Sequence, residues 1–191
     1  MTSMTDPTAP GAPEGVNGLS ATLSPVRTRA ATVNDAELVQ ALYAATPSYF
    51  EIISMPIPTV AEVRTDLATA TSDPRRHVEL VLVDPQAACE GVSVDPTTGA
   101  VVVGYLDYKL YYPQQGDATA NLLQIHPGMQ SSGVGSSCVR DLEERLRTRS
   151  QRMLASIYGN NPRARRFWEG LGYRFAIDAR PLLEWFDKRL A

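Results

Sequence analysis

Cysteine, histidine and lysine are scarce in this chain of 191 residues. Its two cysteines, Cys89 and Cys138, fall in an expected loop and an expected helix, so the sequence predicts neither a disulfide framework nor a cysteine metal cluster. The two histidines, His77 and His126, are far apart in the chain and do not make a metal site by themselves. We therefore expect no metal cofactor.

Long apolar runs and a strong net charge are also missing. No segment approaches the roughly 18 consecutive apolar residues of a membrane span, and the N-terminus lacks the basic and then apolar pattern of a signal peptide. The net charge of −3 argues against nucleic acid as the main partner. These absences favour a cytoplasmic protein that binds neither a membrane nor nucleic acid.

The remaining composition is that of one ordinary globular domain, with 43% apolar and 20% charged residues. Residues 1–26 are rich in Pro, Gly, Thr, Ser and Ala and show no hydrophobic periodicity, so they can bury little surface. We predict a flexible leader over residues 1–26 and a single domain over residues 27–191.

Hydrophobic periodicity in that domain predicts strands mixed with helices. Helices are expected to begin at Asn34 or Asp35, at Thr59, after Gly133 and at Asn161. Pro47 should end the first helix, and the segment from there to Pro58 has no clear period. Strands are expected over residues 26–31, 77–84, 99–112, 118–125, 153–158, 173–178 and 182–190.

The most informative stretch joins the strand that ends at Ile125 to the helix after Gly133. The loop between them, residues 130–135, is built of small residues, and a helix N-terminus leaves backbone N–H groups pointing outward. Such an arrangement binds phosphate, and Gly133 and Gly135 would let a diphosphate approach the backbone because no Cβ stands in the way.

Related loops in other nucleotide-binding proteins fit this stretch less well, and small-residue loops also occur as plain turns. A Walker loop needs a Gly-Lys-Ser/Thr sequence, and no lysine lies near. A Rossmann fingerprint needs a third glycine where Cys138 stands, and an acidic residue after the next strand, where the chain has Tyr158-Gly159-Asn160.

A second informative stretch follows, from Asn161 to Tyr173. Asn161 is a good N-cap, Pro162 a good first helical residue and Gly172 a good helix stop. The pattern between them reads Asn-x-x-Ala-x-x-Phe-aromatic-x-x-x-Gly-aromatic, with Phe167 and Trp168 as its central pair.

Together the two stretches resemble the GNAT superfamily of N-acetyltransferases. Gln130, Gly133 and Gly135 match its acyl-CoA loop, Gln/Arg-x-x-Gly-x-Gly/Ala after a strand, and the Asn161 pattern is similar to the signature after its fifth strand. The resemblance spans residues 27–191. It implies an α/β fold with a mixed, mostly antiparallel sheet of six to seven strands, helices on both faces, and splayed fourth and fifth strands, here those ending at Ile125 and Tyr158.

The resemblance also implies acetyl-CoA as the acyl donor. Backbone groups of Leu123 and Ile125 would pair with the pantetheine arm, the Ile125 N–H would polarise the thioester carbonyl, and the loop N–H groups would hold the pyrophosphate. The implied cofactor-binding residues are Leu123, Gln124, Ile125, Gln130, Ser131, Ser132, Gly133, Val134, Gly135, Ser136, Asn161 and Phe167.

The reaction implied is direct attack of a primary amine on the thioester. Many family members use a tyrosine after the phenylalanine as the acid, and this chain has Trp168 there, so Tyr158 is the candidate replacement. The fourth strand lacks the glutamate that family members often carry. Tyr49, Phe50 and Glu51 are the predicted substrate-binding residues, and Asp107 is a further candidate for substrate binding or base work.

Three functions stay open at this point. The leading one is acetyl transfer to the amine of an unknown small molecule or peptide. A second is a GNAT-fold module that binds CoA or a partner but catalyses weakly or not at all, because of Trp168 and the missing glutamate. A third is transfer to a different acceptor or of a longer acyl chain. Either a monomer or a homodimer would fit, since the closing strands can pair across a dimer.

Overall fold

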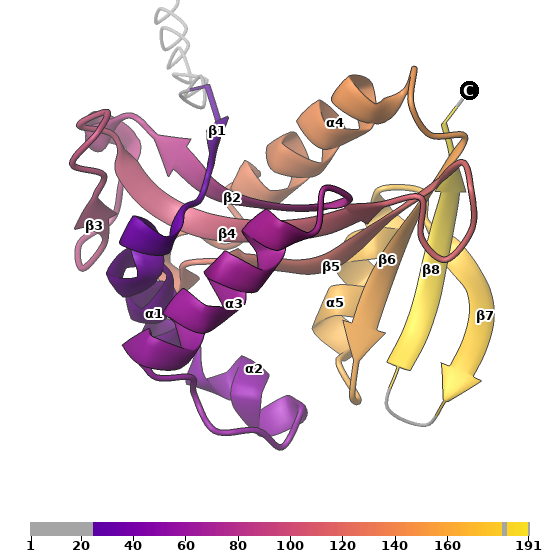
Figure 1. Cartoon of the computed structure of the whole chain (residues 1–191), viewed down its shortest axis with the longest axis horizontal. Coiled ribbons are helices and arrows are strands. Elements are labelled where there is room, and N and C mark those ends of the chain that lie inside the picture. Colours follow the sequence, from indigo (N-terminus) through magenta and orange to yellow (C-terminus); the bar gives the residue numbers. More distant parts are fainter. Residues whose placement is uncertain (1–24, 181–182, 191) are drawn as a thin grey trace, which may run out of the picture.

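The computed structural model of this protein describes residues 25–180 and 183–190. The predicted leader over residues 1–26 therefore lies almost entirely outside the described residues. In this part of the chain eight strands form one sheet, with seven in the order β1-β2-β4-β5-β6-β8-β7 and β3 paired to β4 beside that path (Figure 1). The strands are β1 (Arg27–Ala30), β2 (Arg76–Val83), β3 (Ser93–Val94), β4 (Val101–Leu110), β5 (Asp117–Ile125), β6 (Arg152–Tyr158), β7 (Arg174–Arg180) and β8 (Leu183–Arg189).

The sheet is mixed, because β5 and β6 pair in parallel while the other paired strands are antiparallel. The predicted mixed, mostly antiparallel sheet is thus confirmed. The predicted six to seven strands match the seven of the main path, and the two-residue β3 is an addition within the long loop after β2.

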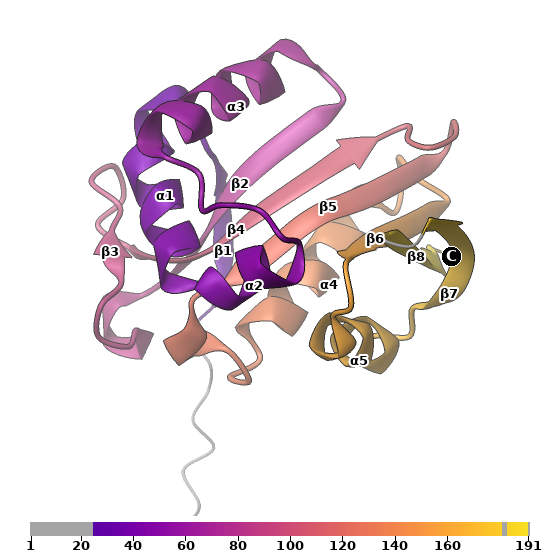
Figure 2. The same cartoon turned by 90° about the horizontal axis from the view of Figure 1, so that it is seen from below.

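Helices cover both faces of the sheet, as predicted (Figures 1 and 2). One buried cluster joins α1 and α3 to the even-numbered core positions of β2, and a second joins α4 and α5 to the opposite face. The helices are α1 (Ala36–Ala45), α2 (Pro47–Ile52), α3 (Val60–Ser72), α4 (Val134–Leu146) and α5 (Pro162–Gly170), with short 3₁₀ turns η1 (Val33–Asp35), η2 (Pro85–Ala87) and η3 (Pro127–Met129). No helix in the described ranges is both long enough and apolar enough to cross a membrane.

The helix starts follow local capping chemistry. Thr59 caps α3 in a reciprocal pair with Glu62, as a Thr-x-x-Glu sequence predicts. The first helix, α1, begins at Ala36 with Asp35 at its N-cap position, one of the two expected positions. Asp35 makes no side-chain cap bond there, and its carboxylate instead completes a capping box with Thr32 at the start of η1. The segment after Pro47, which shows no period in the sequence, is the short helix α2, with the proline in its first turn where a missing N–H costs no hydrogen bond.

One buried ion-pair cluster holds the start of the domain in place. The Arg29 guanidinium on β1 donates to both carboxylate oxygens of Asp35 and of Asp95, at 2.7 to 3.0 Å. Burial alone would raise the pKa of Asp35, but hydrogen bonds from Arg29 and Thr32 lower it, and the Arg29 bonds also lower the pKa of Asp95. The cluster therefore ties β1 to the α1 start and to the turn before β4.

The feature that positions the site is the divergence of β5 and β6. Their parallel ladder runs only from Asp117 opposite Arg152 to Ala120 opposite Ala155. At the next residue, Asn121, the β4–β5 register shifts by one, so β5 carries a bulge there. A bulge bends its strand, and beyond it β5 and β6 separate toward α4 and α5 (Figure 2). The predicted splay is confirmed, and its cause is this extra residue.

Candidate functional site

The edge of β5 that faces the gap carries backbone groups without a ladder partner. The His126 N–H donates to the Val103 carbonyl at 2.8 Å, which fixes the alternation of the β4–β5 ladder. Gln124 therefore points its backbone groups at β4, while Leu123 and Ile125 point theirs toward β6. Because the β5–β6 ladder ends at Ala120, this edge offers the hydrogen-bonding row of an unpaired strand.

The loop after β5 forms a concave row of N–H donors. From Ser131 to Ser136 no backbone N–H has a hydrogen-bond partner among the described residues, and the first helical bond runs from the Ser137 N–H to the Gly133 oxygen at 2.9 Å. Ser131 and Gly133 have φ angles of 63° and 90°, and the α4 N-terminus carries no side-chain cap. Successive N–H groups around left-handed residues make an anion-binding concavity, and the helix dipole adds to it.

Side chains of the loop residues support its shape. The Gln130 amide donates to the Ile125 carbonyl at 2.8 Å, and the Ser132 hydroxyl donates to the Met129 carbonyl at 2.6 Å. These bonds hold the loop close to the end of β5. The loop residues themselves, Ser131 to Ser136, therefore present backbone N–H groups.

The helix α5 meets this loop through an aromatic ring. A Cβ placed on Gly135 would lie 3.4 Å from the Phe167 ring and 3.6 Å from the Ile125 side chain, which is ordinary contact, so the space beyond a Cβ is already filled by these two side chains. Trp168, by contrast, is 5% exposed and packs edge-on against Tyr173 at 4.8 Å between ring centroids. Asn161 caps α5, accepting the Ala164 N–H at 3.0 Å. The structure thus brings Phe167 to the loop and assigns Trp168 to the core.

On the other face of the sheet, α2 covers the end of β6. A Cβ on Gly159 would lie 2.6 Å from the backbone oxygen of Ile52, which shows how closely the two segments approach. Tyr158, the residue before this glycine, is 38% exposed. Burial, with Asp107 nearby, raises the pKa of Tyr158. Burial, with Tyr158 and Asp107 nearby, raises the pKa of Tyr49 to about 12.

Asp107 lies near Tyr49 and Tyr158, and both of its carboxylate oxygens have partners. Its Oδ2 accepts from Nε and Nη2 of Arg76 at 3.0 and 2.6 Å, and its Oδ1 accepts from the Asn121 amide at 3.0 Å. The same guanidinium donates to both oxygens of Asp66 at 2.8 Å. Asp107 is 5% exposed, so this carboxylate is a buried and paired one.

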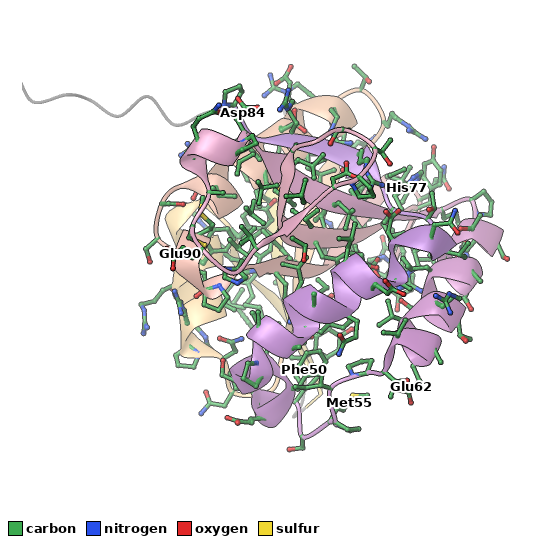
Figure 3. The ribbon with its side chains drawn as sticks, turned by 90° about the vertical axis from the view of Figure 1, so that its left-hand side faces the viewer. Phe50, Met55, Glu62, His77, Asp84 and Glu90 are labelled. Carbon is green, nitrogen blue, oxygen red and sulfur yellow. The ribbon has the colours of Figure 1, made fainter. Side chains whose placement is uncertain are left out.

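The three predicted substrate-binding residues of α2 lie in different surroundings. Tyr49 is half-buried beside Tyr158 and Asp107, which places it at the gap. Phe50 is buried and packs edge-on against Tyr43, at 5.3 Å between ring centroids. Glu51 is exposed to solvent. Figure 3 shows Phe50 and Met55 at one end of the molecule, away from Asp84. Their roles toward a substrate stay predictions.

Two buried polar side chains on the same face have no partner among the described residues. Gln124 is 5% exposed, and neither its amide nitrogen nor its amide oxygen has a hydrogen bond. Tyr105, directly opposite it on β4, is 1% exposed with an unbonded hydroxyl. Sequence reasoning placed Gln124 with the cofactor and overlooked Tyr105 and Arg76, since their positions depend on cross-strand register.

No group of three or more His, Cys, Asp or Glu residues within the described ranges is arranged to hold a metal ion. What the geometry does provide is an open strand edge, an anion-binding loop at its end, and a polar face across the sheet. Such features are typical of proteins that bind an extended, phosphate-bearing ligand between two diverging strands.

Comparisons with known proteins agree with this class. The family model for FR47-like proteins matches residues 113–180, which include the gap, the loop and α5. The crystal structure of an acetyltransferase from Thermus thermophilus is similar at 33% identity and a TM-score of 0.76, covering 88% of this chain and 99% of that one. No protein with a curated description matches the sequence.

More distant structures share the fold. A ribosomal L7/L12 alpha-N-protein acetyltransferase, RimL, solved in complex with coenzyme A, has 12% identity and a TM-score of 0.67, with 89% of this chain and 96% of that one covered. A spermidine N-acetyltransferase from Vibrio cholerae, in complex with CoA and spermine, has 13% identity and a TM-score of 0.64, with 87% and 96% covered. The chain belongs to the GNAT superfamily of acetyltransferases.

Proposed function

We propose that this protein is an N-acetyltransferase that moves the acetyl group of acetyl-CoA to a primary amine. The observation that carries the proposal is the row of unpartnered N–H groups from Ser131 to Ser136, which lies at the end of an unpaired strand edge. A ligand with a diphosphate at one end and amides along its arm satisfies both features at once. Two structures of the same fold were solved with CoA.

The residues present fit acetyl-CoA. The loop N–H groups would hold the pyrophosphate, and Phe167 beside Gly135 would border the arm. Leu123 and Ile125 would pair with the amides of the arm, whereas the Gln124 backbone groups belong to the β4 ladder. When bound, the thioester supplies an activated acetyl group.

The residues around the gap can handle the charges of the transfer. The Ile125 N–H points into the gap, where it can donate to a developing oxyanion. The Tyr158 hydroxyl is protonated at neutral pH, so it can donate a hydrogen bond to a leaving thiolate. Its raised pKa makes it a weaker acid than a thiol of pKa about 8.5, so the contribution proposed here is this hydrogen bond. Trp168 cannot take this role, since its ring lies in the core.

A specific observation favours a second candidate, a module that binds CoA without turnover. On the acceptor face Asp107, the buried carboxylate beside Tyr49 and Tyr158, has both oxygens occupied by Arg76 and Asn121. Asp107 therefore does not provide a free base that could deprotonate an ammonium group. Turnover then requires an amine that is already neutral in part at the working pH.

One experiment distinguishes the two candidate functions. CoA binding is measured by calorimetry, and thiol release from acetyl-CoA is measured with a panel of primary amines. We expect binding and amine-dependent thiol release, both reduced by a Gly135→Val substitution, which pushes a side chain against the Phe167 ring. Binding without release on any amine would favour the silent module, and absence of CoA binding would refute both.

A further inference from the structure

Gln124 is the polar side chain that the acyl-donor site leaves unexplained. Its amide is buried, and both its nitrogen and its oxygen lack partners within the described part of the chain. An unmade buried hydrogen bond costs free energy, so such a group calls for a specific explanation. A chain with an apolar side chain of the same volume at this position would be at least as stable. The simplest explanation for the glutamine is therefore that a ligand is its hydrogen-bond partner.

The position of Gln124 places this amide at the acceptor side of the gap. Along β5, Leu122 packs with the α1–α3 cluster and Leu123 with the α4 cluster, so Gln124 faces the α1–α3 side. Its cross-strand neighbour Tyr105, in the same cluster, brings a second unbonded group, the hydroxyl. Gln124 is also next to Ile125, whose N–H points into the gap.

The chemistry of an amide restricts what it can recognise. A glutamine side chain donates through its nitrogen and accepts through its oxygen, so its full complement presents a donor and an acceptor on the same side. A primary amide does so, and a peptide does so through the N–H and C=O of one extended residue, because a trans peptide bond holds its own two groups on opposite sides. An aliphatic polyamine in its charged form only donates and would leave the Gln124 nitrogen unpaired. An amide one or two bonds from the acceptor amine satisfies both atoms.

Charge on this face points the same way. Arg76 is shared between Asp66 and Asp107, so these three groups together carry one net negative charge. One charge suits a single ammonium group and suits a polycation poorly. Both oxygens of Asp107 already accept hydrogen bonds from Arg76 or Asn121, so this carboxylate gives an ammonium group little help in losing its proton. An α-amine, with a pKa of about 7.7 to 8.0, is roughly 10% neutral at pH 7, whereas an amine of pKa about 10.4 is about 300-fold less so.

We propose that Gln124 pairs with an amide next to the acceptor amine, so that the acceptor is the α-amino group of a peptide or an amino-acid amide. The inference rests on the proposed acetyl transfer and narrows its acceptor. Because Gln124 is 5% exposed, the acceptor reaches it when a covering element moves. The six-residue helix α2, which closes on Gly159, is the short element at this end of the gap.

The test compares matched acceptors with the full-length protein. An amino-acid amide and the methyl ester of the same amino acid share the α-amine and the carbonyl, but only the amide has the N–H that the Gln124 oxygen would accept. Spermidine is the polyamine arm. Turnover is followed as thiol release, and binding is followed by calorimetry with CoA-saturated protein. The variant is Gln124→Met, of similar volume, and the control is Gln115→Met, at an exposed glutamine of the β4–β5 hairpin.

We expect the wild type and Gln115→Met to prefer the amide to the ester by about 10-fold or more in kcat/KM, as one hydrogen bond to a buried group provides. In Gln124→Met the ratio should fall to near 1, while thermal unfolding stays equal or rises. An equal preference for amide and ester in the wild type, a ratio unchanged in Gln124→Met, or faster turnover of spermidine would overturn the inference.

The binding arm separates this inference from the proposed reaction. If the amide binds to the CoA-loaded wild type more tightly than the ester, and Gln124→Met loses this difference, amide recognition is supported even where no thiol is released. In that case the proposed acetyl transfer is refuted and the proposed recognition of an amide by Gln124 is supported. If thiol is released with other amines but amide and ester bind equally, the activity stands and the recognition fails.

Discussion

Replacing Gly159 by alanine tests whether the position of α2 on β6 governs use of the acceptor. The added Cβ would lie 2.6 Å from the Ile52 backbone oxygen and 2.9 Å from its Cγ2 atom, whereas ordinary contact begins at 3.4 Å. The difference between 2.6 and 3.4 Å means that α2 has to retreat by about 0.8 Å. A displacement of about 1 Å at a reacting group can cost on the order of 100-fold in rate. We expect kcat/KM for the amine to fall by roughly 10- to 100-fold.

The matched control is Gly172→Ala, at the other end of α5. Both glycines have a left-handed φ, 63° for Gly159 and 89° for Gly172, so both variants bear a backbone cost of about 1 kcal/mol. At Gly172 the new Cβ meets nothing within 4 Å. The difference between the two variants therefore isolates the contact with α2 from the cost of the φ angle.

Steady-state kinetics with varied amine and varied acetyl-CoA make the comparison. The loss in Gly159→Ala should appear with the amine, while the KM for acetyl-CoA stays within about 2-fold of the control, because the loop and the β5 edge lie on other elements. Equal kinetics in the two alanine variants would refute a role for α2 in the acceptor site. A loss confined to the acetyl-CoA KM would assign the contact to the donor side instead.

Three further predictions concern other parts of the structure. Arg29→Met should lower the free energy of unfolding by about 3 to 5 kcal/mol at pH 7. The folded-state pKa values of Asp35 and Asp95 are lowered, so the stability advantage of the wild type is complete above the unfolded pKa of about 4 and is lost as pH falls toward the folded values. Denaturant titrations from pH 7 to pH 2.5 would show the advantage decreasing. Asn161→Ala should cost about 1 kcal/mol through the lost cap, whereas Asn161→Ser keeps a capping oxygen without adding a charge. Weaker CoA binding in Asn161→Ser at an unchanged melting temperature would identify an amide contact to the ligand, and equal binding would exclude it. Tyr158→Phe should lower kcat by about 100-fold if the hydroxyl is the acid. Because burial raises the pKa of Tyr158 above its ordinary value of 10.0, the readout is kcat at pH 7, and an unchanged kcat would remove the hydroxyl from that role.

The backbone shape of the proposed donor half could be predicted from sequence because it is determined locally. Gln130, Gly133 and Gly135 lie within six consecutive positions, and the turn that they make is determined largely by their own backbone preferences. The α5 helix could be predicted for the same reason, since its cap, first proline and stop glycine are adjacent to the helix that they delimit. For such features the order of residues nearly determines the geometry.

The acceptor half depends on contacts between distant positions, which periodicity does not reveal. Arg76 and Asp107 are 31 residues apart in the chain and contact each other across two strands. Gln124 lies opposite Tyr105 because of the register of a ladder that contains a bulge. Glu51, predicted to bind substrate because of its place between the first two helices, is exposed on α2, and its role stays a prediction. The short helix itself was not expected, because six residues are too few to show a helical period.

The extra residue at Asn121 joins the two halves of the site. By shifting the β4–β5 register it bends β5 away from β6 directly after the last ladder pair, and so it creates the edge on which the donor arm would lie. The amide of the same residue donates to Asp107, which holds that carboxylate on the acceptor face. A side chain at a regular ladder position could hydrogen-bond to Asp107, but its residue would not shift the register of the ladder. The position of Asn121 therefore explains why the opening proposed for the thioester and the polar face proposed for the amine lie at the same point of the sheet.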